Sequence, residues 1–148
     1  MNLHSFSFEI NKNSLKQTLE IINVFYQKDT NIGFVFYCNS YEISQKLGRN
    51  YDISLQTCLL PFKELRTETG NADCFIVKDF SEIEMIVKNE RCTINGIVFD
   101  QITSQIKYGF RIFENVDFYE LYIVNLNERN FEQILYELTH LEGVEALD

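Results

Sequence analysis

The chain has 148 residues, of which 45% are hydrophobic, and it carries a formal net charge of -9 at neutral pH. At this length a single domain removes roughly 70% of the surface of the unfolded chain from water. A single proline and only six glycines exclude a Pro/Gly-rich linker or tail. We therefore predict one compact acidic domain over residues 1–148.

Several classes of protein are excluded at the same stage. No stretch approaches the roughly 18 consecutive apolar residues of a membrane span, and the N-terminus lacks the basic and apolar regions of a signal peptide. We therefore expect a cytoplasmic protein with no membrane contact. The cysteines form no CxxC pair and have no nearby histidine, which predicts reduced thiols and no metal site. These cysteines are Cys38, Cys58, Cys74 and Cys92.

The N-terminal region has the pattern of a β-α-β unit. Residues 3–10 alternate between apolar and polar side chains, with Glu9 on the polar side, as in a half-buried strand. Ser14 and Gln17 form a capping box, after which apolar residues recur at helical spacing. Residues 32–38 are apolar on both faces, which is typical of an interior strand.

The middle of the chain is less regular. Its patterns predict a short helix, a strand and a helical turn, at residues 40–47, 53–59 and 61–67. A short strand follows at residues 73–78. Ser81 and Glu84 then make a second capping box, which predicts a helix after Ser81.

From residue 91 the pattern predicts a meander of strands. Asn95-Gly96 lies between two apolar runs and indicates a hairpin, because both residues tolerate positive φ. Residues 102–112 alternate as a long strand, and residues 118–126 form the strand that returns beside it. We expect Arg111 to face Glu120 across this second hairpin, as an opposite-charge pair.

The last predicted element is an amphipathic helix with Asn130 as its N-cap and Gly143 just after its end. Together these elements predict an α+β fold. Its sheet is mixed but largely antiparallel, with an N-terminal β-α-β start, a C-terminal strand meander and a final amphipathic helix. The apolar stripe of that helix contains Phe131, Ile134, Leu135, Leu138 and Leu141.

The charge of the chain is concentrated at its C-terminal end. Residues 112–148 hold nine of the 22 acidic residues but only one of the 13 basic residues, Arg129. Summed like charge in one region favours basic partners and repels nucleic acid and anionic membranes. Basic residues elsewhere are dispersed, which argues against direct binding of nucleic acid.

From this asymmetry we predict a non-catalytic binding protein that neutralises a basic protein partner. An immunity protein or inhibitor of a nucleic-acid-cleaving toxin has this general character. Carboxylates would raise the encounter rate, and tyrosines would supply rigid contact area. The predicted partner-binding residues are Glu114, Asp117, Tyr119, Tyr122, Glu128, Glu132, Tyr136 and Glu137.

Two alternatives remain open at this stage. One is an enzyme or small-ligand domain whose pocket is assembled from residues distant in sequence. Against it, no nucleophile motif and no phosphate-binding loop is present, so we predict no catalytic residue and no cofactor. The other is a homo-oligomer that pairs through the aromatic meander, residues 104–126.

Overall fold

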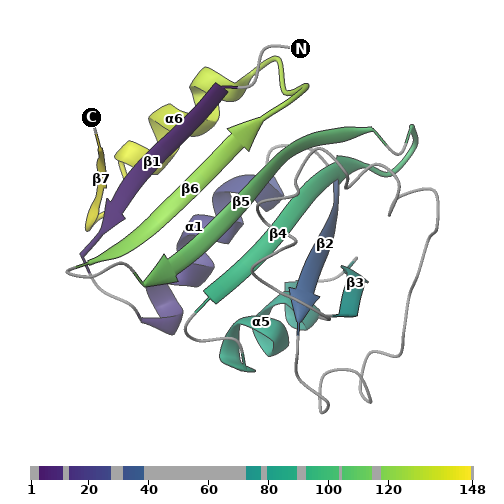
Figure 1. Ribbon diagram of the computed structural model, residues 1–148, viewed down its shortest axis with the longest axis horizontal. Coiled ribbons are helices and arrows are strands. Elements are labelled where there is room, and N and C mark those ends of the chain that lie inside the picture. The colour runs from purple at the N-terminus through teal and green to yellow at the C-terminus, as the bar shows by residue number, and fades with distance from the viewer. Residues whose placement is uncertain are drawn as a thin grey trace.

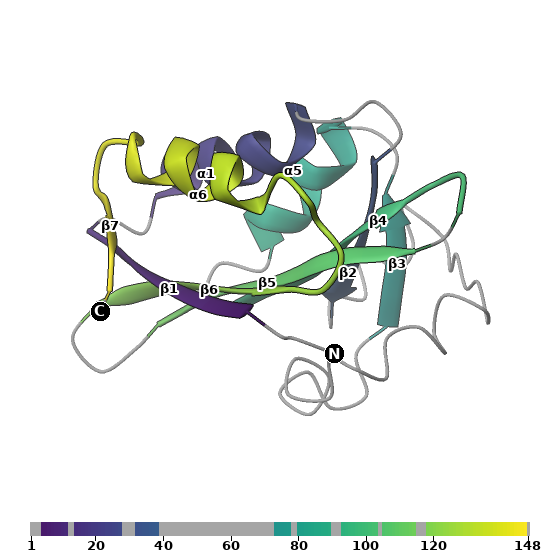
Figure 2. The same cartoon turned by 90° about the horizontal axis from the view of Figure 1, so that it is seen from above.

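Among the residues that it describes, the computed structural model shows one seven-stranded sheet with three helices on one of its faces (Figures 1 and 2). The strand order is β3-β2-β4-β5-β6-β1-β7, and every neighbouring pair is antiparallel. The predicted α+β class is confirmed. The structure describes residues 4–11, 14–27, 32–38, 73–77, 80–89, 93–103, 105–114 and 118–147.

The β-α-β start is also present, in an extended form. Strand β1 (His4–Ile10) leads through helix α1 (Leu15–Gln27) to β2 (Ile32–Cys38), which runs parallel to β1. The two strands are separated in the sheet by β4, β5 and β6. The predicted cap is confirmed by a hydrogen bond of 3.1 Å from the Gln17 amide to Ser14 Oγ. The Gln17 side-chain amide also donates to the carbonyl of Glu142 at 3.0 Å, which ties α1 to the turn before the C-terminal end.

The hydrophobic core lies between the sheet and its three helices, α1, α5 (Phe80–Asn89) and α6 (Phe131–Thr139). Helix α5 begins at Phe80 rather than after Ser81, and it follows β3 (Asp73–Val77) along the chain. Apolar residues three and four apart on each helix are buried against the sheet. The buried helix residues include Ile21, Ile22, Phe25, Ile83, Ile86, Val87, Phe131, Ile134 and Leu138.

The predicted hairpin at Asn95-Gly96 is wrong, because both residues lie inside the continuous strand β4 (Thr93–Asp100). Glycine is required there for space rather than for a turn. The ring of Phe110 packs over Gly96, and a Cβ at this position would lie 2.5 Å from Phe110 Cζ. The chain turns later, where Asp100 Oδ1 accepts hydrogen bonds from the amides of Ile102 and Thr103.

The second hairpin joins β5 (Ile106–Glu114) to β6 (Tyr119–Asn125), with a register different from the predicted one. Arg111 faces Tyr122, and Glu120 faces Phe113. The difference is two residues, which leaves every side chain on its predicted face of the sheet. The alternation of apolar residues was therefore unable to distinguish the two registers.

The C-terminal end differs from the prediction in two ways. Asn130 occupies the N-cap position of α6 without a side-chain cap, and instead its amide donates to Glu128 Oε1 at 3.0 Å. Gly143, with φ of 82°, directs the chain into a further strand, β7 (Val144–Ala146), which pairs with β1. The elements predicted between residues 40 and 67 lie outside the described residues.

Candidate partner-binding surface

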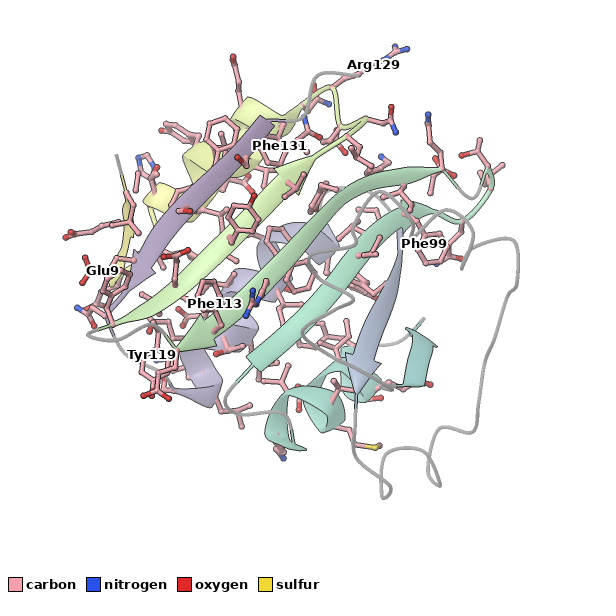
Figure 3. All side chains as sticks on the ribbon, viewed as in Figure 1. Glu9, Phe99, Phe113, Tyr119, Arg129 and Phe131 are labelled. Carbon is pink, nitrogen blue, oxygen red and sulfur yellow. The ribbon has the colours of Figure 1, made fainter. Side chains whose placement is uncertain are left out.

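Three glutamates lie side by side across neighbouring strands of the sheet. Glu9 of β1 pairs directly with Glu120 of β6 on one side and with Glu145 of β7 on the other. Directly opposed residues have Cβ atoms about 5 Å apart. We call Glu120, Glu9 and Glu145 the glutamate row. Figure 3 labels Glu9 at the end of β1 that lies beside β7.

The glutamate row lies on the face of the sheet turned away from the helices. Side chains alternate between the faces of a strand, and Phe8 and Ile10, on either side of Glu9, are buried in the core. We use the name open face for the part of this face that is formed by strands β5, β6, β1 and β7. Glu9 and Glu120 are half-buried on it, and Glu145 is exposed.

Next to the glutamate row, the open face carries aromatic and basic side chains. Phe113 pairs with Glu120 and extends the row onto β5. The guanidinium carbon of Arg111 lies 4.3 Å from the centroid of the Phe113 ring. Tyr122 stands between Arg111 and Ser7 in the next row of the sheet. The open face thus carries a half-buried tyrosine beside three carboxylates.

A second acidic surface lies on the outer side of α6. Glu132, Tyr136 and His140 follow one another at intervals of four residues and are exposed, and Tyr136 is 58% exposed. The ring of His140 packs on that of Tyr136, with centroids 4.1 Å apart. His140 Nδ1 lies 2.7 Å from the carbonyl oxygen of Tyr136. Since a carbonyl only accepts, Nδ1 is the donor in this hydrogen bond.

The two acidic surfaces are not continuous. Helix α6 belongs to the helix layer (Figure 2), whereas strand alternation places the glutamate row on the other side of the sheet. The fold therefore separates Glu132 and Tyr136 from Glu120 and Glu145, which sequence analysis had placed in one segment. It adds Glu9, from the nearly neutral N-terminal part, to the residues of the C-terminal end.

Other predicted partner-binding residues lie in different surroundings within the fold. Tyr119 packs against the hydrophobic core, and Glu114 lies opposite it at the end of β5. Glu128 is engaged within the chain, because its carboxylate is 3.3 Å from Lys107 Nζ in a largely buried ion pair. Glu137 is half-buried. Asp117 lies outside the described residues.

Glu9 was not among the predicted residues, because its acidic neighbours are adjacent across the sheet and not along the chain. The alternation of residues 3–10 did place Glu9 on the polar side of its strand. Its neighbours, however, come from β6 and β7, more than 100 residues away in sequence. The only available signal was the polar side of a predicted strand.

A buried tyrosine lies in the core, away from both acidic surfaces. The ring of Tyr108 is packed between Phe25 and Phe131, with centroid distances of 5.4 and 5.8 Å. Its hydroxyl has no hydrogen-bond partner among the described residues. Burial raises the pKa of this hydroxyl well above its ordinary value, and the nearby charge of Glu128 raises it further. The arrangement is that of a packed core residue.

Within the part of the chain that the structure describes, no group of three or more His, Cys, Asp or Glu residues is arranged to hold a metal ion. No helix among those residues is long and apolar enough to cross a membrane. Comparisons with protein-family models, curated proteins and solved structures find no match. A functional argument for this chain therefore rests on its own surfaces.

Proposed function

We propose that this chain is a non-catalytic, cytoplasmic binding protein that neutralises a basic protein partner. An immunity protein or inhibitor that covers the cationic site of a nucleic-acid-cleaving toxin is the kind of protein that fits. The observation that carries the proposal is the glutamate row, in which three carboxylates stand directly opposite one another on a face that no described helix covers.

Like charges in directly opposed positions destabilise a sheet, by up to about 1 kcal/mol for a pair. The glutamate row contains two such pairs, Glu120 with Glu9 and Glu9 with Glu145. A cationic surface placed over the row would relieve this repulsion. Basic side chains placed over Glu9 and Glu145 would reduce the repulsion within that pair, which favours the bound state.

Tyr122 supports the same surface. It is half-buried on the open face, between Ser7 and Arg111. A tyrosine held in the sheet loses little conformational entropy on binding and supplies buried contact area. The carboxylates would then govern the encounter rate, while Tyr122 would contribute to the lifetime of the complex.

The test compares the glutamate row with the α6 surface. The full chain is immobilised and exposed to host lysate at low salt, the captured protein is identified, and its association rate is measured over a range of salt concentrations. The triple variant Glu9→Gln, Glu120→Gln, Glu145→Gln should reduce that rate by roughly tenfold or more. The control variant Glu132→Gln changes one charge on α6 and should leave the rate nearly unchanged. An association rate independent of salt would exclude the proposal.

A further inference from the structure

The outer edge of β1 is covered along only part of its length. Strand β7 pairs with residues Phe8 to Ile10, and the amide of Leu147 donates to the carbonyl of Ser7 at 2.8 Å. None of the described residues pairs with the outer edge of β1 before Ser7. In Figure 1, β7 lies along the outer edge of β1 at one end, and no strand is drawn along that edge at the other end.

The part of this edge with which no described residue pairs presents backbone hydrogen-bonding groups. In an antiparallel strand, alternate residues direct both their N–H and C=O groups to the same side. The carbonyl of Ser7 and the amide of Asn11 both bond toward β7 and its preceding turn. Ser5 has the same parity as these residues, so its N–H and C=O point outward at the uncovered edge.

The uncovered edge also has an exposed apolar side chain. Phe8 and Ile10, which lie beside β7, are each 2% exposed, whereas Phe6 is 38% exposed. All three point to the helix side of the sheet, where the ring of Phe6 packs against that of Phe131 at 5.5 Å. A strand placed in line with β7 would cover Phe6 as β7 covers its neighbours.

We propose that a basic, extended segment of the partner adds to the sheet at this edge, antiparallel to β1 and in line with β7. This inference rests on the proposed function, since it states how the basic partner is held. A second copy of the chain is disfavoured as the occupant, because each copy carries a charge of -9. Unpaired edges of this kind accept an extended segment through main-chain hydrogen bonds.

The position of the glutamate row fits this occupant. Glu9 is four residues from Ser5 along the same strand, which corresponds to about 13 Å. In an added strand, the residue opposite Ser5 would direct its side chain to the open face, where a basic residue fits. The residue opposite Phe6 would direct its side chain to the helix side, where an apolar residue fits. The segment should therefore alternate between basic and apolar residues.

The probe is a short blocked peptide of alternating lysine and valine, titrated onto the full chain at low salt. In the proposed geometry the lysine amides point toward β1 and the valine amides point away. N-methylation of the lysine amides should weaken binding at least tenfold, and the same number of methyl groups on the valine amides should leave it nearly unchanged. Hydrogen exchange at the Ser5 amide should slow at least tenfold on binding.

A protein variant provides an independent measurement. Ser5→Pro removes an outward N–H that takes no part in the pairing of β1 with β6, and proline is tolerated at such edge positions. It should weaken peptide binding at least tenfold, whereas Ser5→Ala should retain it. If Ser5→Pro does not fold, the two methylated peptides still decide the question on the unmodified chain.

The outcomes separate this inference from the proposed function. If the two methylated peptides bind equally well and the Ser5 amide gains no protection, strand addition is wrong. Loss of peptide binding in the Glu9, Glu120 and Glu145 triple glutamine variant would in that case still support a basic partner. If the peptide does not bind the full chain at low salt, both the strand addition and the basic partner are contradicted.

Discussion

Successive residues of one strand point to opposite faces of the sheet, and these two faces differ in how far their side chains are buried. On β5, Phe110 and Ile112 point to the helices and are buried, whereas Arg111 and Phe113 point to the open face and remain partly exposed. Burial of apolar area is the dominant source of stability, so the helix side should hold the fold. The open face is then free to carry charge, including the directly opposed pair of Glu9 and Glu145.

The largest expected effect tests this division on a single strand. Phe110 is fully buried, with its ring 4.9 Å from that of Phe25, and truncation of such a residue typically costs 3–5 kcal/mol. We expect Phe110→Ala to lower the free energy of unfolding by about 4 kcal/mol in urea titrations. Phe113→Ala, on the open face, should lower it by about 1 kcal/mol, in part through loss of the Arg111 contact. Equal losses would show that both faces stabilise the fold alike.

The division between the faces could be predicted from the sequence, because it follows from alternation alone. Residues 3–10 already separated the apolar side from Glu9, and α1 and α6 were located from their helical spacing and, for α1, from its cap. These are local patterns, in which each residue is compared with neighbours a few positions away. Local patterns determine which way a side chain points.

What lies beside that side chain could not be predicted in the same way. A two-residue change of register keeps the faces and changes every partner, so Arg111 was expected to face Glu120 and instead faces Tyr122. Strand β7 has only three residues, too few for alternation to be recognised. Gly96 was read as a turn residue because its role depends on Phe110, from another strand. The glutamate row depends on two such pairings and was therefore missed.

A smaller effect concerns the one polar group that the helix side buries without a partner among the described residues, the Tyr108 hydroxyl. An unsatisfied buried hydroxyl costs desolvation energy that phenylalanine would not. We expect Tyr108→Phe to raise the free energy of unfolding by about 1 kcal/mol at neutral pH. Tyr119→Phe, at a partly buried position, should change it by less than about 0.5 kcal/mol. Marked destabilisation by Tyr108→Phe would mean that a bound water satisfies the hydroxyl.

Tyr108 should also make the free energy of unfolding depend on pH in alkaline solution. Burial, and secondarily Glu128, raises the pKa of Tyr108 in the folded chain, whereas in the unfolded chain its pKa is about 10. Above that pH the unfolded chain releases the proton and the folded chain retains it, so stability falls as pH rises. The slope should reach at most about 1.4 kcal/mol per pH unit. Urea midpoints measured up to pH 11 should show a shallower decline for Tyr108→Phe than for the unmodified chain.

The smallest expected effect lies on the open face and has the opposite sign to truncation of the core. Glu9 is the central member of the glutamate row, so Glu9→Gln removes the repulsion with both Glu120 and Glu145 while keeping the shape of the side chain. We expect it to stabilise the free protein by about 0.5 kcal/mol at low salt. The gain should shrink as salt is added, because exposed charges are screened over about 8 Å at physiological ionic strength.

The control for this prediction is Glu132→Gln, which removes an equal charge from α6. Glu132 lies in the first turn of its helix, where a negative charge interacts favourably with the helix dipole. Its removal should therefore reduce stability slightly, in contrast to Glu9→Gln. If both variants were stabilising to the same extent, relief of net charge would explain the result and the glutamate row would have no special cost. If only Glu9→Gln stabilises the free protein, and it also weakens partner association, then Glu9 favours binding at a cost in stability. Substitutions of core residues on the helix side should not raise stability and weaken binding together.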